Sequence, residues 1–317
     1  MDQITPIAQR LNPAKFRDPA VTATGQPRAS VALRSLNTLW FNTGTLCNLT
    51  CANCYIESSP RNDRLSYLTL AEMGGYLDEI ARDSLPTRLI GFTGGEPFMN
   101  PDIIAMLRDV LSQGLHALVL TNAMAPMRRL RPDLLALREA HGNRLTIRVS
   151  LDHYDRDLHE RERGPGIWDP TMDGLIWLAR NGFATDVAGR RFTAEPEDRL
   201  RAGYASLFGR NDIAIDASDP VRLMLFPEMD PVHDVPEITT ACWDILHKSP
   251  DDVMCASARM VVKRKGADHP VVLACTLLPY DPAFALGRTL AEAARSVPLN
   301  HPHCASFCVL GGAACSR

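Results

Sequence analysis

From residue 38 onward, short apolar runs of strand length alternate with longer amphipathic stretches. The apolar runs lie at 38–43, 88–93, 116–121, 144–151, 183–187 and 221–226. Between them, apolar residues recur at helical spacing in the segments 69–83, 101–114, 132–142 and 170–182. Strands and helices that alternate in this way form parallel sheets with helical crossovers. The pattern therefore predicts an α/β fold of six βα units.

Two architectures fit six βα units, a partial (β/α)6 TIM-like barrel and a doubly wound sheet, and periodicity alone does not separate them. The chain has 317 residues, of which 45% are hydrophobic, a size that suits one barrel with a small appendage. The chemistry of the motifs described below favours the partial barrel.

The sequence also predicts a division into three parts. Residues 1–35 contain Pro13, Pro19 and Pro27 and few periodic apolar positions, so we expect an N-terminal extended arm. Residues 36–233 form the expected barrel. In residues 234–317 the alternation ends and cysteines recur, and RMVVKRKGADHPVVL predicts a β-hairpin in a small C-terminal domain.

The charge balance excludes some classes of partner. The chain has 34 basic and 37 acidic residues and a formal net charge of −3, so no global field favours nucleic acid or anionic lipid. No apolar run approaches the roughly 20 residues of a membrane span, and the N-terminus does not have the order of a signal peptide. We therefore expect a cytoplasmic protein that binds neither nucleic acid nor membrane.

Cysteines are the second informative feature. Three of the nine fall at 47, 51 and 54, and the other six lie beyond residue 241. Because reducing conditions disfavour a disulfide framework, this usage favours metal or redox chemistry. Three thiolates leave one iron of a [4Fe–4S] cluster with an open coordination position, whereas a structural zinc ion normally takes four protein ligands.

The segment CNLTCANCY (47–55) resembles the cluster-binding motif of the radical S-adenosylmethionine (SAM) superfamily. The resemblance implies a [4Fe–4S] cluster on Cys47, Cys51 and Cys54, with SAM chelated to the open iron and Tyr55 near the adenine. It also implies cleavage of SAM to a 5′-deoxyadenosyl radical, which abstracts a hydrogen atom from the substrate.

The segment IGFTGGEPFMNP places a second motif at the end of the next strand. Gly94 and Gly95 let a ligand approach bare backbone, Pro97 ends the strand, and Glu96 offers a carboxylate to a cationic amine. The stretch resembles the GGEP motif of the same superfamily, which implies that these residues hold the SAM ammonium group.

The stretch SLDHYDRDLHERERGPG follows the fourth strand and resembles the superfamily's ribose- and carboxylate-binding segment. The resemblance implies that Ser150 and Asp152 lie near the ribose. Arg163 is the expected partner of the methionine carboxylate because a guanidinium binds a carboxylate in a bidentate manner. Arg161 is the alternative, unless both arginines are solvated. Asn122, at the end of the third strand, is a further candidate.

The C-terminal cysteines resemble the auxiliary-cluster region called SPASM, or twitch in its shorter form. The resemblance implies that Cys255, Cys275, Cys304 and Cys308 hold a second [4Fe–4S] cluster. The full form has seven cysteines in a different final spacing, so one auxiliary cluster is expected rather than two. A zinc site is the alternative, because four thiolates also bind zinc.

Cys242 and Cys315 are left over, and either can replace one of the four auxiliary ligands; we name Cys315 as the alternative. Cys242 lies in an apolar helical pattern, so it is either a buried inert thiol or a hydrogen-atom donor at the barrel mouth.

The resemblance implies an oxidoreductase that abstracts hydrogen from a small molecule or peptide and passes the remaining electron to the auxiliary cluster. It also implies an external donor of the flavodoxin or ferredoxin type. Alternatives are a ribosomal-peptide maturase that cross-links or epimerises, a radical methyltransferase, and a non-catalytic iron–sulfur or zinc sensor. The sensor does not explain GGEP, and the methyltransferase's usual cobalamin domain or methyl-carrying cysteine pair is not evident.

Overall fold

The computed structural model describes residues 10–230 and 232–312. Its centre is a nine-stranded sheet in the order β10-β9-β8-β2-β3-β4-β5-β6-β7. Six neighbouring strands run parallel in chain order. They are β2 (Thr38–Asn42), β3 (Leu89–Thr93), β4 (His116–Thr121), β5 (Leu145–Ser150), β6 (Ala184–Arg191) and β7 (Leu223–Pro227). The edge strands β7 and β10 do not pair within the described residues, so the predicted partial (β/α)6 barrel is confirmed.

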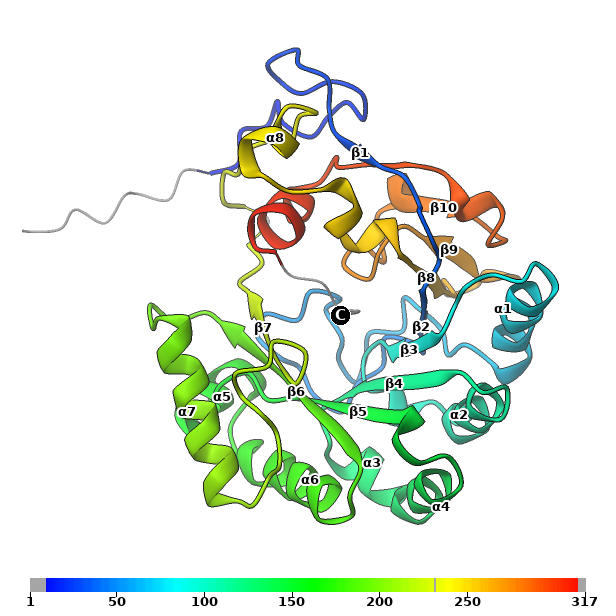
Figure 1. Ribbon diagram of the computed structural model, residues 1–317, viewed down its shortest axis with the longest axis vertical. Coiled ribbons are helices and arrows are strands. Elements are labelled where there is room, and N and C mark those ends of the chain that lie inside the picture. The colour runs from blue at the N-terminus through cyan, green and yellow to red at the C-terminus, as the bar shows by residue number, and fades with distance from the viewer. Residues whose placement is uncertain (1–9, 231, 313–317) are drawn as a thin grey trace, which may run out of the picture.

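The major helices cover the outer side of this curved sheet (Figure 1). They are α1 (Leu70–Arg82), α2 (Ile103–Ser112), α3 (Ala125–Arg129), α4 (Arg131–His141), α5 (Arg156–Arg163), α6 (Trp168–Arg180) and α7 (Glu197–Arg210). Local sequence explains where they begin: Thr69 forms a capping box with Glu72 at α1, and the Asp155 carboxylate accepts from the Leu158 amide at α5. The helices α5 and α7 were not among the helical segments that the sequence predicted.

The C-terminal part extends the same sheet. The strand β8 (Ala258–Val262) pairs in parallel with β2 and antiparallel with β9 (Val271–Leu273), and β9 pairs with β10 (Ala285–Gly287). The predicted hairpin is therefore confirmed as β8 and β9, and it continues the barrel. Shorter helical segments connect these strands. They are α8 (Cys242–Leu246), η3 (Pro250–Asp252), η4 (Met254–Ala256), η5 (Pro282–Phe284), η6 (Glu292–Ala294) and the π-helical η7 (Cys304–Leu310).

The N-terminal arm packs against the C-terminal part. Its strand β1 (Ser30–Val31) pairs with β11 (Val297–Pro298). The Glu237 carboxylate accepts hydrogen bonds from the Phe16 amide at 2.7 Å, the Ala23 amide at 2.7 Å and the Arg28 guanidinium at 2.5 Å. The three-part division at 35 and 233 stays a prediction, but these contacts join the first part to the third.

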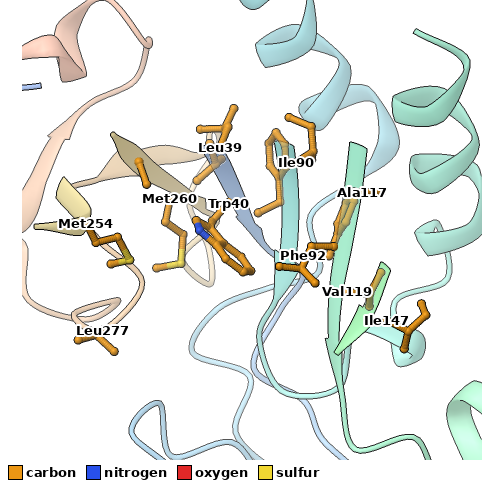
Figure 2. Close-up of a cluster of buried hydrophobic side chains, with 14 of the residues drawn as sticks. Leu39, Trp40, Ile90, Phe92, Ala117, Val119, Ile147, Met254, Met260 and Leu277 are labelled. Carbon is orange, nitrogen blue, oxygen red and sulfur yellow. The ribbon is translucent and has the colours of Figure 1, made fainter. Parts of the chain in front are cut away.

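Apolar side chains fill both faces of the sheet. Figure 2 shows Leu39 and Ile90 on the helix-covered side and Trp40 on the opposite side, where Met254 and Leu277 of the C-terminal part also lie. All five side chains are buried. Because both faces of the sheet are covered, the sequences of its strands are nearly continuous runs of apolar residues. In the described part of the chain, no helix is long and apolar enough to cross a membrane.

Candidate functional site

The site lies at the carboxyl ends of the barrel strands, where a cavity is bounded by the loops that follow β2, β3, β4 and β5. This is the end of a parallel barrel at which ligands bind. The cavity brings together most of the residues predicted to bind the catalytic cluster and SAM. Those that line it are Cys47, Cys51, Cys54, Tyr55, Gly94, Gly95, Asn122, Ser150, Asp152 and Arg163.

The loop after β2 carries the three cysteines. Backbone amides already point at two of the sulfurs: Leu49 N–H donates to Cys47 Sγ at 3.4 Å, and Ser58 N–H donates to Cys54 Sγ at 3.3 Å. Burial raises the pKa of Cys47 to about 12, and the charges of Cys51 and Cys54 add to the effect. Cys47 is therefore a neutral thiol without a metal and needs a cationic partner to become a thiolate, which fits iron ligation.

The Gly-Gly-Glu-Pro segment after β3 is held against the cysteine loop by its backbone. Gly95 N–H donates to Gly44 O at 2.9 Å, and Glu96 N–H donates to Leu46 O at 3.1 Å. A Cβ atom on Gly95 would lie 2.1 Å from Leu46 O, and Gly94 has a φ of 136°. Both positions therefore require glycine because two loops pack backbone to backbone.

Glu96 does not line the cavity, and its expected contact with the SAM ammonium group stays a prediction. The side chain is buried and accepts three hydrogen bonds, from the amides of Phe98 and Asn122 and the hydroxyl of Thr121. Burial raises its pKa to about 7. Glu96 thus ties the loop after β3 to the loop after β4. Pro97 is also buried and begins η1 (Pro97–Met99) outside the cavity lining.

Asn122, at the end of β4, is held in place beside the cysteine loop. Its Nδ2 donates to Asn48 Oδ1 at 2.9 Å, and its Oδ1 accepts from the Met124 amide at 3.1 Å. Its side chain therefore lines the cavity in an orientation that Asn48, the neighbour of Cys47, helps to fix.

The loop after β5 and the end of α5 place Asp152 and Arg163 together. Arg163 donates from Nε to Asp152 Oδ2 and from Nη2 to Oδ1, both at 2.9 Å. Burial opposes the charge on Asp152, but Arg163 holds the pKa of that carboxyl below its usual range. Arg161 lies elsewhere: its side chain is 56% exposed and stacks on Phe192. Of the two arginines considered, only Arg163 lines the cavity.

Arg190, at the end of β6, lines the cavity and was not predicted from the sequence. Its guanidinium pairs with Glu162 at 2.9 Å and Glu228 at 2.6 Å. Glu162 in turn accepts from Asn53 Nδ2 at 2.9 Å, and its carbonyl accepts from the Ala52 amide. The residues between Cys51 and Cys54 are therefore anchored to α5 and β6.

The remaining wall of the cavity is apolar. It consists of Phe226 and Met229 from the end of β7 and the chain that follows it, and of Leu277 and Phe307 from the C-terminal part. The rings of Phe226 and Phe307 stack with centroids 5.4 Å apart. Phe307 lies in η7, so the helix that carries Cys304 and Cys308 borders the cavity directly.

Three of the C-terminal cysteines, Cys255, Cys275 and Cys304, lie near enough to influence one another electrostatically. Burial raises the pKa of Cys304 well above its usual range, and the charges of Cys275 and Cys255 raise it further. Cys308 lies four residues along the same π-helical segment. Within residues 10–230 and 232–312, no three His, Cys, Asp or Glu side chains are grouped closely enough to hold a single metal ion. The auxiliary cluster and the zinc alternative therefore both stay predictions.

Cys242 lies apart from the cavity lining, at the start of α8. Its sulfur accepts from the Thr239 amide at 3.4 Å and lies 3.4 Å from the Thr239 hydroxyl. This position gives it no contact with the cavity, and the hydrogen-donor role stays a prediction. Cys315 lies outside the described residues.

Comparison with known proteins identifies the class of the protein. Residues 41–191 match the profile described as the Radical SAM superfamily. The chain thus carries a radical SAM domain, and the cofactors of that superfamily are a [4Fe–4S] cluster and SAM. The motif at Cys47, Cys51 and Cys54 and the cavity beside it lie within the matched region.

Three curated relatives are similar to this chain. The AdoMet-dependent heme synthase of Methanosarcina barkeri is 31% identical over 43% of this chain and 37% of its own length. The antilisterial bacteriocin subtilosin biosynthesis protein AlbA of Bacillus subtilis is 29% identical over 45% of this chain and 30% of its own length. The mycofactocin maturase MftC of Mycobacterium tuberculosis is 27% identical over 44% of this chain and 33% of its own length. The chain thus matches 37% or less of the length of each of these relatives.

Solved structures share the fold. Streptococcus suis SuiB bound to S-adenosylmethionine has a TM-score of 0.58 at 13% identity, over 80% of this chain and 63% of that one. The protein anSMEcpe with bound AdoMet has a TM-score of 0.57 at 14% identity, over 81% of this chain and 79% of that one. In both, the likeness reaches well beyond residues 41–191 and includes part of the C-terminal region.

Proposed function

We propose that this protein reductively cleaves SAM, abstracts a hydrogen atom from its substrate, and completes a two-electron oxidation with an auxiliary [4Fe–4S] cluster. One observation carries the proposal. The cysteine triplet, the Gly94–Gly95 backbone, Asn122, Ser150 and Arg163 line a single cavity. The cysteines, the glycines, Asn122 and Ser150 come from the ends of four successive barrel strands, and Arg163 ends α5. Their common position supports a SAM site in this cavity.

Each of these residues has a distinct task. Cys47, Cys51 and Cys54 ligate the catalytic cluster. When bound, the cluster and SAM supply the 5′-deoxyadenosyl radical that takes a hydrogen atom from the substrate. The carbonyls of Gly94 and Gly95 are assigned to the methionine ammonium group, because the amides of Gly95 and Glu96 already donate to the cysteine loop.

The remaining parts of SAM meet side chains. Arg163 has three N–H groups beyond the two that bind Asp152, and these bind the methionine carboxylate. Ser150 hydrogen-bonds the ribose, and Tyr55 and Asn122 border the adenine. Asp152 supports the ribose site by holding Arg163, and it keeps unused lone pairs for a hydroxyl.

The auxiliary cluster is assigned to Cys255, Cys275, Cys304 and Cys308, with Cys315 as the alternative ligand. Held by these cysteines, the cluster would supply a one-electron acceptor for a substrate that has lost a hydrogen atom, and the accompanying proton would leave to solvent. An external donor of the flavodoxin or ferredoxin type supplies the electron that cleaves SAM. The contact of Phe307 with the cavity supports this order, because Phe307 belongs to the segment that carries Cys304 and Cys308.

The apolar wall of the cavity suits a substrate that presents a hydrocarbon group to the radical. A small molecule or a peptide side chain satisfies this requirement. The relatives favour ribosomal-peptide maturation as the second candidate. AlbA is named as a bacteriocin biosynthesis protein, MftC is named as a maturase, and SuiB is solved with its precursor peptide SuiA.

The test is anaerobic reconstitution with iron and sulfide, followed by metal analysis and detection of 5′-deoxyadenosine after dithionite reduction with SAM. We expect about eight irons per chain and formation of 5′-deoxyadenosine. About four irons with the product would remove the auxiliary cluster from the proposal. Zinc without SAM cleavage would refute the proposed activity.

A further inference from the structure

Arg259, on β8, is a buried arginine at the proposed auxiliary cluster. Its side chain is 1% exposed. Its four hydrogen bonds all go to backbone carbonyls: Nη1 donates to Cys255 O at 2.6 Å and Ala258 O at 2.8 Å, Nε donates to Ala293 O at 2.9 Å, and Nη2 donates to Arg295 O at 3.2 Å. Four of the five N–H groups of the guanidinium thus have printed acceptors, and none of these neutral carbonyls neutralises its charge.

The other fully buried arginines are neutralised. Arg28 pairs with Glu237 at 2.5 Å, and Arg148 pairs with Asp186 at 3.4 Å. In the described part of the chain, Arg259 forms no ion pair with any carboxylate within 4.0 Å. A buried charge is costly unless an opposite charge lies nearby. The fold therefore keeps one cation in its interior whose counter-charge has to come from another group.

The titratable side chains that influence Arg259 are cysteine thiols, which become anionic only when they ligate a metal. Cys255 and Cys275 are the residues whose charges act on the guanidinium. The hydrogen bond to Cys255 O fixes it on the backbone of the first proposed ligand. A [4Fe–4S] cluster with four thiolates carries net negative charge, and gains one further negative charge when it is reduced. Arg28 also faces Cys304, but Glu237 already neutralises it.

We propose that Arg259 is the counter-cation of the auxiliary cluster and raises its reduction potential, so that the cluster accepts an electron from the substrate radical. The inference rests on the proposed auxiliary cluster. A fixed positive charge in a low-dielectric interior stabilises the reduced, more negative state over the oxidised state. Arg259 acts through the cluster and does not touch the substrate cavity.

The test isolates the auxiliary cluster in the full chain with Cys47, Cys51 and Cys54 all changed to alanine. This parent and its variants are reconstituted anaerobically with iron and sulfide and titrated with dithionite, while the reduced cluster is followed by EPR. We expect Arg259→Met to keep about four irons and to lower the reduced-to-oxidised ratio at a fixed potential at least tenfold, about 59 mV for one electron. Arg259→Lys keeps the charge and is expected to lie nearer the parent.

The matched control is Arg295→Gln, which removes an exposed charge from a neighbouring residue whose carbonyl accepts from Arg259. Because water screens that charge, its loss is expected to leave the titration close to the parent. If Arg259→Met keeps its iron and titrates like Arg295→Gln, Arg259 serves only as a hydrogen-bond donor to the backbone carbonyls around it. The proposal is then overturned. If the parent itself binds no iron, the auxiliary cluster is absent and both proposals fail.

Loss of iron in Arg259→Met is also decisive when it is compared with Arg259→Lys. Lysine retains the charge but not the planar set of donors. Retention of iron and potential in Arg259→Lys would assign the requirement to the charge, as proposed. Equal loss of iron in both variants would assign it to the four carbonyl hydrogen bonds and overturn the proposal.

Discussion

Arg163 binds Asp152 through two parallel hydrogen bonds of 2.9 Å, one from Nε and one from Nη2. The pair joins the last residue of α5 to the loop after β5, and both side chains are nearly buried. Bidentate pairing fixes the plane of the guanidinium, so its remaining donors face the cavity in a set direction. The pair therefore organises the proposed carboxylate site before SAM arrives.

Replacing Asp152 with asparagine is expected to destabilise the fold and weaken SAM binding. The change leaves the Arg163 cation buried without its carboxylate, which costs about 3–5 kcal/mol in the free energy of unfolding. Urea denaturation and equilibrium dialysis of SAM measure the two effects. Asp83→Asn is the matched control, because it breaks the exposed Arg82–Asp83 pair and should change neither quantity appreciably. Equal effects of the two changes would contradict the organising role of Asp152.

Removing cysteines from the two groups should separate their roles. Cys51→Ala is expected to abolish SAM cleavage, because the catalytic cluster loses one of its three ligands. Cys304→Ala is expected to spare SAM cleavage and to lose roughly half of the reconstituted iron. Iron analysis and quantification of 5′-deoxyadenosine measure the outcomes. Equal loss of SAM cleavage in both variants would contradict the separate roles predicted for the two groups of cysteines.

The parts of the site that follow from local sequence were predictable. The triplet of Cys47, Cys51 and Cys54 is a short segment, and its position after a strand places it at the carboxyl edge of a parallel sheet. The same logic placed Gly94, Asn122 and Ser150 at the ends of the next strands. Since strand ends meet at one edge of a barrel, these residues converge without any long-range information.

The contacts that the sequence did not reveal depend on long-range packing. The direction of Glu96 is set by donors on β4 and the loop after it, Thr121 and Asn122, which no local pattern specifies. Arg190 was missed because the apolar run ends at residue 187, whereas β6 continues through polar residues to Arg191. A strand that is predicted from a run of apolar residues ends where that run ends. The polar residues at the end of the strand, which face the site, are then left out of the prediction.

The pairing of β8 with β2 is another contact that depends on long-range packing. The sequence predicts the β8–β9 hairpin from two β-branched runs and a turn between them. It does not specify that β8 joins the edge of the barrel in parallel, more than 200 residues after β2. Parallel pairing has no connecting turn to signal it, so it is decided by burial of both faces of the sheet.

A Gly95→Ala change is expected to disrupt the catalytic loop. The added Cβ would lie 2.1 Å from the Leu46 carbonyl oxygen, so the loop after β3 must move off the cysteine loop. Overpacking of this kind costs about 1–3 kcal/mol, and iron loading should fall with it. Gly74→Ala is the matched control, since nothing lies within 4 Å of its added Cβ in α1 and helix propensity should stabilise it by about 0.5–1 kcal/mol. Thermal unfolding and iron analysis compare the two, and a Gly95→Ala protein as stable and iron-loaded as Gly74→Ala would contradict the loop packing.

Glu96 should make the stability of the cluster-free protein fall as pH rises. Burial raises its pKa to about 7 from an ordinary value of 4.5, so between these pH values the folded chain holds a proton that the unfolded chain has released. Stability is therefore greatest below about pH 4.5 and is lost as pH rises through 7, by about 3 kcal/mol in total. Glu96→Gln does not titrate and isolates this contribution from the other carboxylates. The difference in unfolding free energy between the wild type and Glu96→Gln, measured in urea from pH 4.5 to 7.5, should decline by that amount. A difference that stays constant over this range would mean that Glu96 is ionised in the folded chain, with its three donors outweighing its burial.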